Sequence, residues 1–289
     1  MRSNDMFSQF KDEWFITIWD GDKHLHSSKP ITVDGPLSPC GMTPDDVDIQ
    51  MKKGLNRHIL EISGMNQESF EYFADKYGET YQYLYFFKSQ KISDFSPLSR
   101  MPHLQGVRIY WNIKADRLWD MSDNRELIYL HIVDCKKLVY EPELLKTSST
   151  LKHIKLCGSV WNNYHMKNLQ CFEDMTSLEY LELLSITPDA YDPDIISRIP
   201  RLKRFDFDPG MLTTEQIAYL CARQPELEGK CLCAYNKEDA SGLGVRVCGK
   251  RKPSLEIPED QKRLDKYVKE FDQLVEKYRN DMIRDREGF

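Results

Sequence analysis

The sequence contains no long apolar run. None of its apolar stretches approaches the roughly 20 residues that a membrane-spanning helix requires. The segment from Met1 to Phe10 also lacks the apolar core of about 7 to 15 residues that a secretion signal requires. We therefore expect a soluble, cytoplasmic protein with no membrane partner.

An excess of positive charge is absent as well. The chain has 40 lysine and arginine residues against 46 aspartate and glutamate residues, which gives a formal net charge of −6. Proteins that hold nucleic acid by its phosphates usually carry a basic excess or a basic face. We therefore expect no nucleic-acid partner.

Recognisable catalytic motifs are missing. The sequence has no HExxH, GxSxG or phosphate-loop motif, each of which sets reactive groups at a fixed spacing. Gly242-x-Gly244 followed by Gly249-Lys250 does not match a phosphate loop, because Arg251 follows the lysine. We therefore expect a non-enzymatic protein without a cofactor.

The cysteines show no metal-binding motif. Cys231-Leu-Cys233 with Cys248 lacks the C-x-x-C spacing and has no histidine nearby in sequence, so a strand edge is favoured over a metal clip. Without a secretion signal, we expect reduced thiols that serve mostly as small apolar residues. The eight cysteines are Cys40, Cys135, Cys157, Cys171, Cys221, Cys231, Cys233 and Cys248.

One apolar pattern returns along the middle of the chain. It has the form apolar, two free positions, apolar, one free position, apolar, and successive copies begin 23 to 27 residues apart. This spacing and form are typical of leucine-rich repeats. The six copies are Tyr81/Leu84/Phe86, Leu104/Val107/Ile109, Leu127/Leu130/Ile132, Leu151/Ile154/Leu156, Leu178/Leu181/Leu183 and Leu202/Phe205/Phe207.

The spacing dictates which residues are buried. Apolar residues two apart on a strand point to the same side of a sheet, and one repeat cannot bury that edge alone. Stacked repeats bury it together. We therefore predict an α/β fold: a leucine-rich repeat solenoid with a curved parallel sheet on one face, helices and irregular connectors on the other, and caps at both ends. Leu60 and Ile62 are expected to form a degenerate first rung.

The turn after each strand usually begins with a buried Asn or Cys, three residues after the apolar pattern ends. Asn112 and Cys135 occupy this position, and Ser89 and Ser159 are small and polar enough to fit it. Ile186 and Gly210 do not match, which predicts irregular later turns.

One connector carries a more specific resemblance. The run Ile92-Ser-Asp-Phe-Ser-Pro-Leu98, followed by Leu104, resembles the connector of internalin-type bacterial leucine-rich repeats. The resemblance implies a bacterial repeat protein that binds a partner, although the secretion and anchoring signals of internalins are not visible. The repeat pattern itself covers Gly54 to Leu227.

Three domains are expected. Residues 1–54 should form an N-terminal cap with a β-hairpin that starts at Trp14 to Trp19, and residues 55–227 the repeat domain. Residues 228–289 should form a C-terminal cap with short strands and a long amphipathic helix from about Pro258 to Ile283. That helix also carries a short heptad seam, so a monomer is favoured and a dimer through this helix is the alternative.

The residues between and beside the buried pairs should face outward as one binding surface for a protein or peptide. They combine aromatic rings with Arg and His, a composition found at interface hot spots. The alternative is that a cap covers the aromatic end from Tyr83 to Phe87 and makes it core. The predicted binding residues are Tyr83, Tyr85, Phe87, Arg108, Tyr110, Tyr129, His131, His153, Lys155, Tyr180, Glu182 and Arg204.

Two other functions stay open. His131 and His153 lie diagonally on adjacent predicted rungs, which would allow a metal-dependent protein or an enzyme of unrecognised chemistry. An exported interaction protein or effector without a standard signal is the other alternative.

Overall fold

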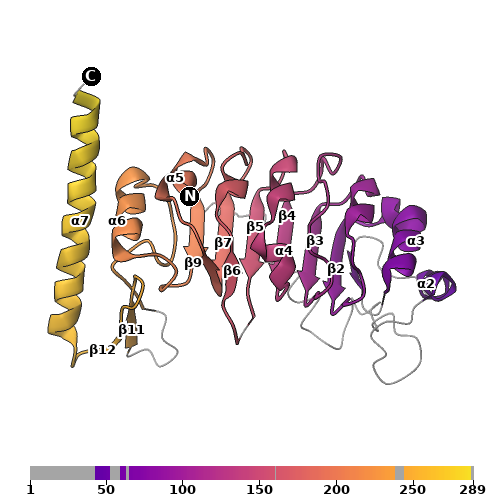
Figure 1. The fold of residues 1–289 in the computed structure, drawn as a ribbon, viewed down its shortest axis with the longest axis horizontal. Coiled ribbons are helices and arrows are strands. Elements are labelled where there is room, and N and C mark those ends of the chain that lie inside the picture. The colour runs from indigo at the N-terminus through magenta and orange to yellow at the C-terminus, as the bar shows by residue number, and fades with distance from the viewer. Residues whose placement is uncertain (1–42, 53–58, 63–64, 160, 238–243, 288–289) are drawn as a thin grey trace, which may run out of the picture. The chain divides into compact units, whose positions relative to one another are not determined.

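The computed structural model of the chain describes residues 43–52, 59–62, 65–159, 161–237 and 244–287 (Figure 1). The hairpin expected at Trp14 to Trp19 lies outside these residues. The chain divides into two compact units, Met1–Leu138 and Val139–Phe289, and each is considered separately.

The first unit contains a strand for each of its predicted rungs. Its strands run parallel in chain order, and the register places Leu60 opposite Leu84, then Val107, then Leu130. The degenerate rung at Leu60 and Ile62 is therefore a real strand. The strands are β1 (Ile59–Ile62), β2 (Tyr83–Phe87), β3 (Gly106–Tyr110) and β4 (Tyr129–Val133).

The second unit repeats the arrangement. Its parallel strands are β5 (His153–Cys157), β7 (Tyr180–Leu184) and β9 (Arg204–Phe207). Ile154 lies opposite Leu181, and Leu181 opposite Phe205. After β9, an isolated parallel bridge joins Arg204 to Glu228.

The repeated apolar residues form the core of both units. Every residue of the six triplets is buried, and Leu202 is the most exposed of them at 9%. Parallel strands of matching register, one for each triplet, confirm the predicted leucine-rich repeat fold.

Polar side chains close the turns that leave the strands. The buried Asn112 donates to the carbonyls of Ser89 and Ile92 at 2.7 and 2.9 Å and accepts from the backbone N–H groups of Lys114 and Ala115. Asparagine suits this position because one amide supplies donors and acceptors to a backbone that has no strand partner there.

The residue after several strands adopts a left-handed backbone. Lys88, Trp111, Asp134 and Ser185 have φ between 51° and 56°. This conformation is uncommon for residues other than glycine. Its recurrence at the same position shows that one turn type serves several repeats.

Helices and 3-10 turns connect the strands of the first unit. Asn66 and Ser69 form a capping box at the start of α3, and Phe70 and Phe73 are buried on one side. The elements are α2 (Pro44–Met51), α3 (Gln67–Tyr77), η1 (Gly78–Thr80) and η2 (Ser96–Arg100); α4 (Lys136–Tyr140) runs across the division of the chain.

Helix α2 was not predicted. Among its described side chains only Val47 is buried, so its sequence shows no apolar period. Contacts with α3 hold it instead: Tyr72 and Tyr77 donate to Asp48 at 2.9 and 2.7 Å, and Lys76 lies 2.6 Å from the same carboxylate.

The second unit has less regular connectors. Ile186, which does not fit the turn position, begins β8, and β8 pairs with β6 in a separate small sheet. Ile186 therefore starts a strand at the position where earlier repeats have a polar turn residue, and the irregularity of the later turns stays a prediction. The elements are η3 (Glu143–Thr147), β6 (Tyr164–Met166), η4 (Gln170–Phe172), β8 (Ile186–Pro188), α5 (Pro193–Arg198) and α6 (Thr214–Arg223).

The C-terminal helix α7 packs against other elements near the end of the second unit. Helix α7 packs along α6 (Figure 1). Leu264 and Phe271 of α7 are buried. Within the described part of the chain, no helix is long and apolar enough to cross a membrane. The elements are β10 (Tyr235–Asn236), β11 (Gly244–Val247), β12 (Ser254–Glu256) and α7 (Gln261–Glu287).

Candidate functional site

The outward side of the first unit is largely buried. Tyr83 and Tyr85 are each 4% exposed, and Arg108 and His131 are each 8% exposed. These four predicted binding residues therefore do not lie on an open surface. Their burial agrees with the alternative in which the rings at this end form core.

An aromatic cluster fills this side. Tyr83 and Tyr85 pack with Phe87, Tyr110 and Tyr129. The rings of Phe87 and Tyr110 stack almost parallel, at 6° with centroids 5.5 Å apart, and the centroids of Tyr85 and Phe87 are 5.8 Å apart. Offset ring pairs of this kind stabilise beyond the area they bury. The cluster is thus a structural part of the first unit.

The cluster ends in an exposed rim. Phe87 and Tyr110 are half-buried, and Trp111 is 38% exposed. The ammonium of Lys88 lies 5.0 Å from the Phe87 ring centroid and 5.3 Å from that of Trp111. The left-handed turn places Lys88 and Trp111 here, so an accessible aromatic surface lies at the ends of β2 and β3.

The second unit shows the alternation that the sequence predicts. Along β5 and β7 the inward residues are buried and the outward residues are half-buried. Arg204 on β9 is half-buried as well. The predicted binding residues His153, Lys155, Tyr180, Glu182 and Arg204 therefore share one partly open face.

Tyr180 is the centre of a polar network on that face. Its hydroxyl donates to the carboxylate of Glu182 and lies 3.1 Å from Asp206 Oδ2. Lys155 Nζ is 3.0 Å from Glu182 Oε2, and Arg204 Nε is 2.7 Å from Asp206 Oδ2. Each carboxylate is thus paired with one cation and with the tyrosine.

The network keeps the tyrosine neutral. Burial raises the pKa of Tyr180, and its hydrogen bond to Glu182 and the nearby negative charges raise it further. The cations of Lys155 and Arg204 lie 5.3 and 5.7 Å from its ring centroid, within the range of cation–π attraction. Tyr180 therefore acts as a hydrogen-bond donor with a polarised ring and not as a base.

Two acidic residues outside the predicted binding set complete the face. Asp206 is 3% exposed and also accepts the backbone N–H of Lys230 at 2.9 Å. Asp208 accepts the backbone N–H of Ser185, and burial raises its pKa. The signal in the sequence was their place at alternate positions after Arg204, in β9 and directly after it.

The structure gives no support to the proposed metal site. His131 belongs to the first unit and lies edge-on to Tyr129, with centroids 6.2 Å apart; His153 belongs to the second unit and lies 5.9 Å from Tyr180. Among the described residues, no group of three or more His, Cys, Asp or Glu side chains could hold a metal ion. The pairing of the two histidines stays a prediction.

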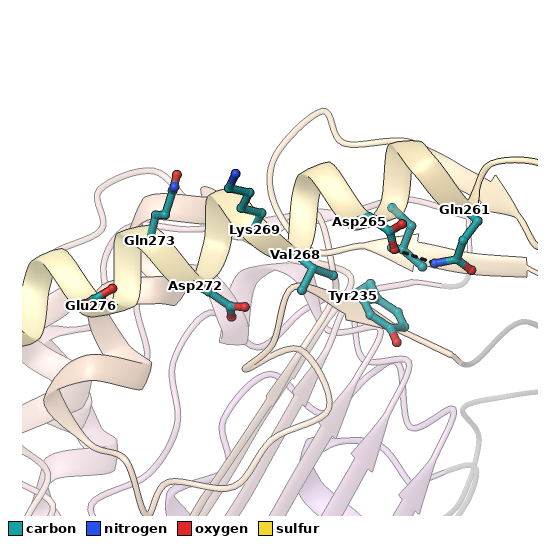
Figure 2. Close-up of a pocket in the computed structure, with 9 residues that line it drawn as sticks. Tyr235, Gln261, Asp265, Val268, Lys269, Asp272, Gln273 and Glu276 are labelled. Carbon is teal, nitrogen blue, oxygen red and sulfur yellow. Dashed lines mark hydrogen bonds between the residues drawn. The ribbon is translucent and has the colours of Figure 1, made fainter.

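A shallow groove runs along α7 and was not predicted. Val268 lies on the side of α7 that faces Tyr235 of β10, whereas Lys269 and Gln273 point away from that side (Figure 2). Gln261 donates to Asp265 at 2.7 Å (Figure 2). The groove brings together no reactive pair. Its lining residues are Tyr235, Gln261, Leu264, Asp265, Val268, Lys269, Asp272, Gln273 and Glu276.

Comparison with known proteins finds similarity in structure only. No protein-family model matches the chain, and no curated protein matches it. An internalin (inlF) of Listeria monocytogenes matches 62% of this chain and 48% of its own, at 15% identity and a TM-score of 0.38. The matched part is therefore less than two thirds of that internalin. Internalin C2 of the same species matches 70% of this chain and 79% of its own, at 16% identity and a TM-score of 0.42.

Proposed function

We propose that this protein is a non-enzymatic binding module that holds a protein or peptide on the outward face of β5, β7 and β9. The observation that carries the proposal is the partly open row of Lys155, Tyr180, Glu182 and Arg204, with its cations, carboxylates and ring already in place. Leucine-rich repeat proteins commonly bind partners on such an extended face.

The chemistry of the row favours a polypeptide partner. Lys155 and Arg204 offer donors, Glu182 offers acceptors, and Tyr180 offers a ring between them. Tyrosine and arginine are enriched among residues that contribute most of the binding energy at interfaces. Because neighbouring contacts already hold these side chains, less conformational entropy is lost on binding than at a flexible surface.

The rim of the first unit is proposed as a separate contact surface. Trp111 is 38% exposed and lies beside the half-buried Tyr110 and Phe87. We propose that this rim contributes apolar contact area, in place of the buried Tyr83 and Tyr85. The protein is further proposed to be cytoplasmic, monomeric and free of cofactors; these statements rest on the sequence.

Quantitative capture of a partner from the native cell tests the proposal. The full chain is immobilised, bound proteins are identified, and capture is repeated with Tyr180→Ala and Arg204→Ala. We expect each variant to weaken capture about tenfold or more, the effect of roughly 1.4 kcal/mol at a hot spot.

Lys146→Ala is the matched control, since Lys146 is an exposed cation on η3 of the same unit. Its capture should equal that of the unmodified chain. Capture that survives both face variants, with melting temperatures unchanged, would exclude this face as the binding site.

A further inference from the structure

Arg204 binds its carboxylate partner through one nitrogen only. Its Nε donates to Asp206 Oδ2 at 2.7 Å, and Arg204 has no other hydrogen bond or ion pair among the described residues. The two Nη nitrogens, which carry the remaining N–H donors of the guanidinium, are therefore unpaired in that part of the chain. In the other ion-paired arginines described, an Nη nitrogen faces the carboxylate; these are Arg100, Arg198, Arg263 and Arg284.

The guanidinium of Arg204 is held in place through its Nε edge. The side chain of Asp206 is 5% exposed, and this carboxylate also accepts the backbone N–H of Lys230 at 2.9 Å. The guanidinium carbon lies 5.7 Å from the ring centroid of Tyr180. A long side chain loses conformational entropy when a ligand orders it, and these contacts have already ordered much of this one.

The unpaired edge is also the most accessible part of the network around Tyr180. The side chain of Arg204 is 41% exposed, whereas those of Lys155 and Glu182 are 13% and 15% exposed. The charge of Lys155 is matched by Glu182 at 3.0 Å. The N–H donors of Arg204 are therefore the group of this network that a ligand can reach and that has a charge to offer.

The chemistry of this edge fits a carboxylate. Two parallel N–H groups of a guanidinium match the two oxygens of a carboxylate, and a phosphate fits the same fork. However, the carboxylates of Asp206 and Glu182 belong to the same network, and Glu228 lies opposite Arg204 across the isolated bridge. Negative charges at this distance oppose a dianion more strongly than a monoanion. A ligand with a single negative charge is the better match.

A bound chain can continue past Arg204 in either direction. Arg201 and Lys203, which precede it, are exposed, and so is Glu228 opposite it. These neighbours leave room for a polypeptide to run on beyond the contact. A carboxylate on a side chain therefore suits this place better than one at the end of a chain.

We propose that Nη1 and Nη2 of Arg204 bind the side-chain carboxylate of an aspartate or glutamate in a peptide partner. This inference rests on the proposed function of the β5, β7 and β9 face and adds the kind of residue that the face selects. Asp206 and Tyr180 act as positioning residues, because they fix the guanidinium from its other edge and beside the ring.

A peptide array tests the proposal. The full chain is incubated with immobilised random peptides, one set unphosphorylated and one set containing phosphoserine, and the bound sequences are ranked. We expect the strongest binders to share an aspartate or glutamate at one position. Replacing that residue by its amide should weaken binding to the unmodified chain about tenfold or more, because the amide lacks the charge that strengthens the hydrogen bonds.

Arg204→Lys keeps the charge but removes the fork of parallel donors. This variant should bind the acidic peptide about tenfold more weakly, and it should bind the acidic and amide peptides almost equally, since the two changes remove the same contact. Arg201→Lys, at an exposed arginine before β9, is the matched control and should distinguish the two peptides as the unmodified chain does. If Arg204→Lys fails to fold, modification of the unmodified chain by a dicarbonyl reagent decides: the acidic peptide should protect Arg204 and the amide peptide should not.

The outcomes separate this proposal from the one on which it rests. Peptides that lose binding to Tyr180→Ala but bind equally as acid and amide would overturn the carboxylate contact and leave the proposed face standing. Binding by phosphoserine peptides alone would overturn it in favour of a phosphate contact. Acidic peptides that bind Arg204→Lys and Tyr180→Ala as tightly as the unmodified chain would contradict both proposals. An array without any bound peptide would overturn this proposal, whereas capture of a folded protein through Tyr180 and Arg204 would still support the proposed function.

Discussion

Asn112 shows at the scale of one residue how a repeat turn is stabilised. Its amide makes hydrogen bonds to four backbone groups while the side chain is 1% exposed. A buried polar group that loses its partner costs free energy, so each of these bonds protects a group that water cannot reach. Asn124 acts similarly: it donates to the carbonyls of Leu98 and Met101 and accepts from Trp119.

Asn112→Ala should lower the free energy of unfolding by about 3 kcal/mol or more, because it leaves several buried backbone groups without partners. Urea unfolding of the full chain measures the change. Asn163→Ala, at an exposed asparagine, should change it by less than about 0.5 kcal/mol. Equal losses for the two variants would show that the turn does not depend on the amide.

Asp208 links stability to pH. Burial raises its pKa in the folded state, so folding favours the protonated carboxyl. Stability from this group is therefore present below the unfolded pKa, near pH 4, and is lost as the pH rises through the folded pKa. Asp208→Asn keeps an acceptor for Ser185 but cannot ionise.

The melting temperature of Asp208→Asn should accordingly rise relative to the unmodified chain as the pH increases from about 4, and then level off. Thermal melts across this pH range measure the difference. Asp174→Asn, at an exposed site, is the control for the substitution itself. A difference that is constant over the range, or that shrinks as the pH rises, would contradict the assignment.

At the scale of elements, the repeat strands were predictable and the connectors only in part. Strand positions follow from a period of two within each triplet, and burial of one face fixes the register, since a slip of one residue would expose the core. Helix α2 escaped prediction because contacts from α3 to Asp48, and not its own apolar pattern, hold it. The pairing of β6 with β8 joins segments far apart in sequence, which no local signal encodes.

The candidate site was predictable by position but not by exposure. The pattern correctly placed Tyr85 and Tyr180 on the outward side of their strands, yet Tyr85 is buried in a ring cluster and Tyr180 is half-buried in an ionic network. Exposure depends on what packs over a strand, and sequence periodicity contains no information about that. The role of Asp206 likewise depends on Arg204 and Lys230, which the fold brings to it.

Helix α7 can be tested as a cap. Phe271 is 6% exposed, so Phe271→Asp buries a charge and should cost more than about 3 kcal/mol of unfolding free energy. Ile283→Asp, at a 51% exposed position of the same helix, should cost little. Sedimentation should give a monomer for the unmodified chain. A dimer that Phe271→Asp converts to a folded monomer would instead establish the coiled-coil alternative.

At the scale of the whole molecule, the outward side chains differ between the two units. The first unit buries its rings and leaves an aromatic rim around Trp111, whereas the second leaves a row of paired charges around Tyr180 partly open. The buried rings of the first unit and the row of charges come from the same outward strand positions of the repeat, whereas Trp111 lies in the turn after β3. A repeat fold can therefore use equivalent positions for core packing in one unit and for a proposed binding surface in the other.

Arginine reactivity in the presence of the captured partner locates the contact most directly. Arg204 on the proposed face and Arg198 on α5 have side chains 41% and 51% exposed, and each is paired with a carboxylate. Their rates of modification by a dicarbonyl reagent are compared by mass spectrometry with and without saturating partner. The proposal predicts that the rate at Arg204 falls about tenfold or more while that at Arg198 is unchanged, because an interface excludes water and reagent from the residues at its centre. Protection of Arg198 with Arg204 left as reactive as in the free protein would place the partner on the connectors and contradict the proposed binding face.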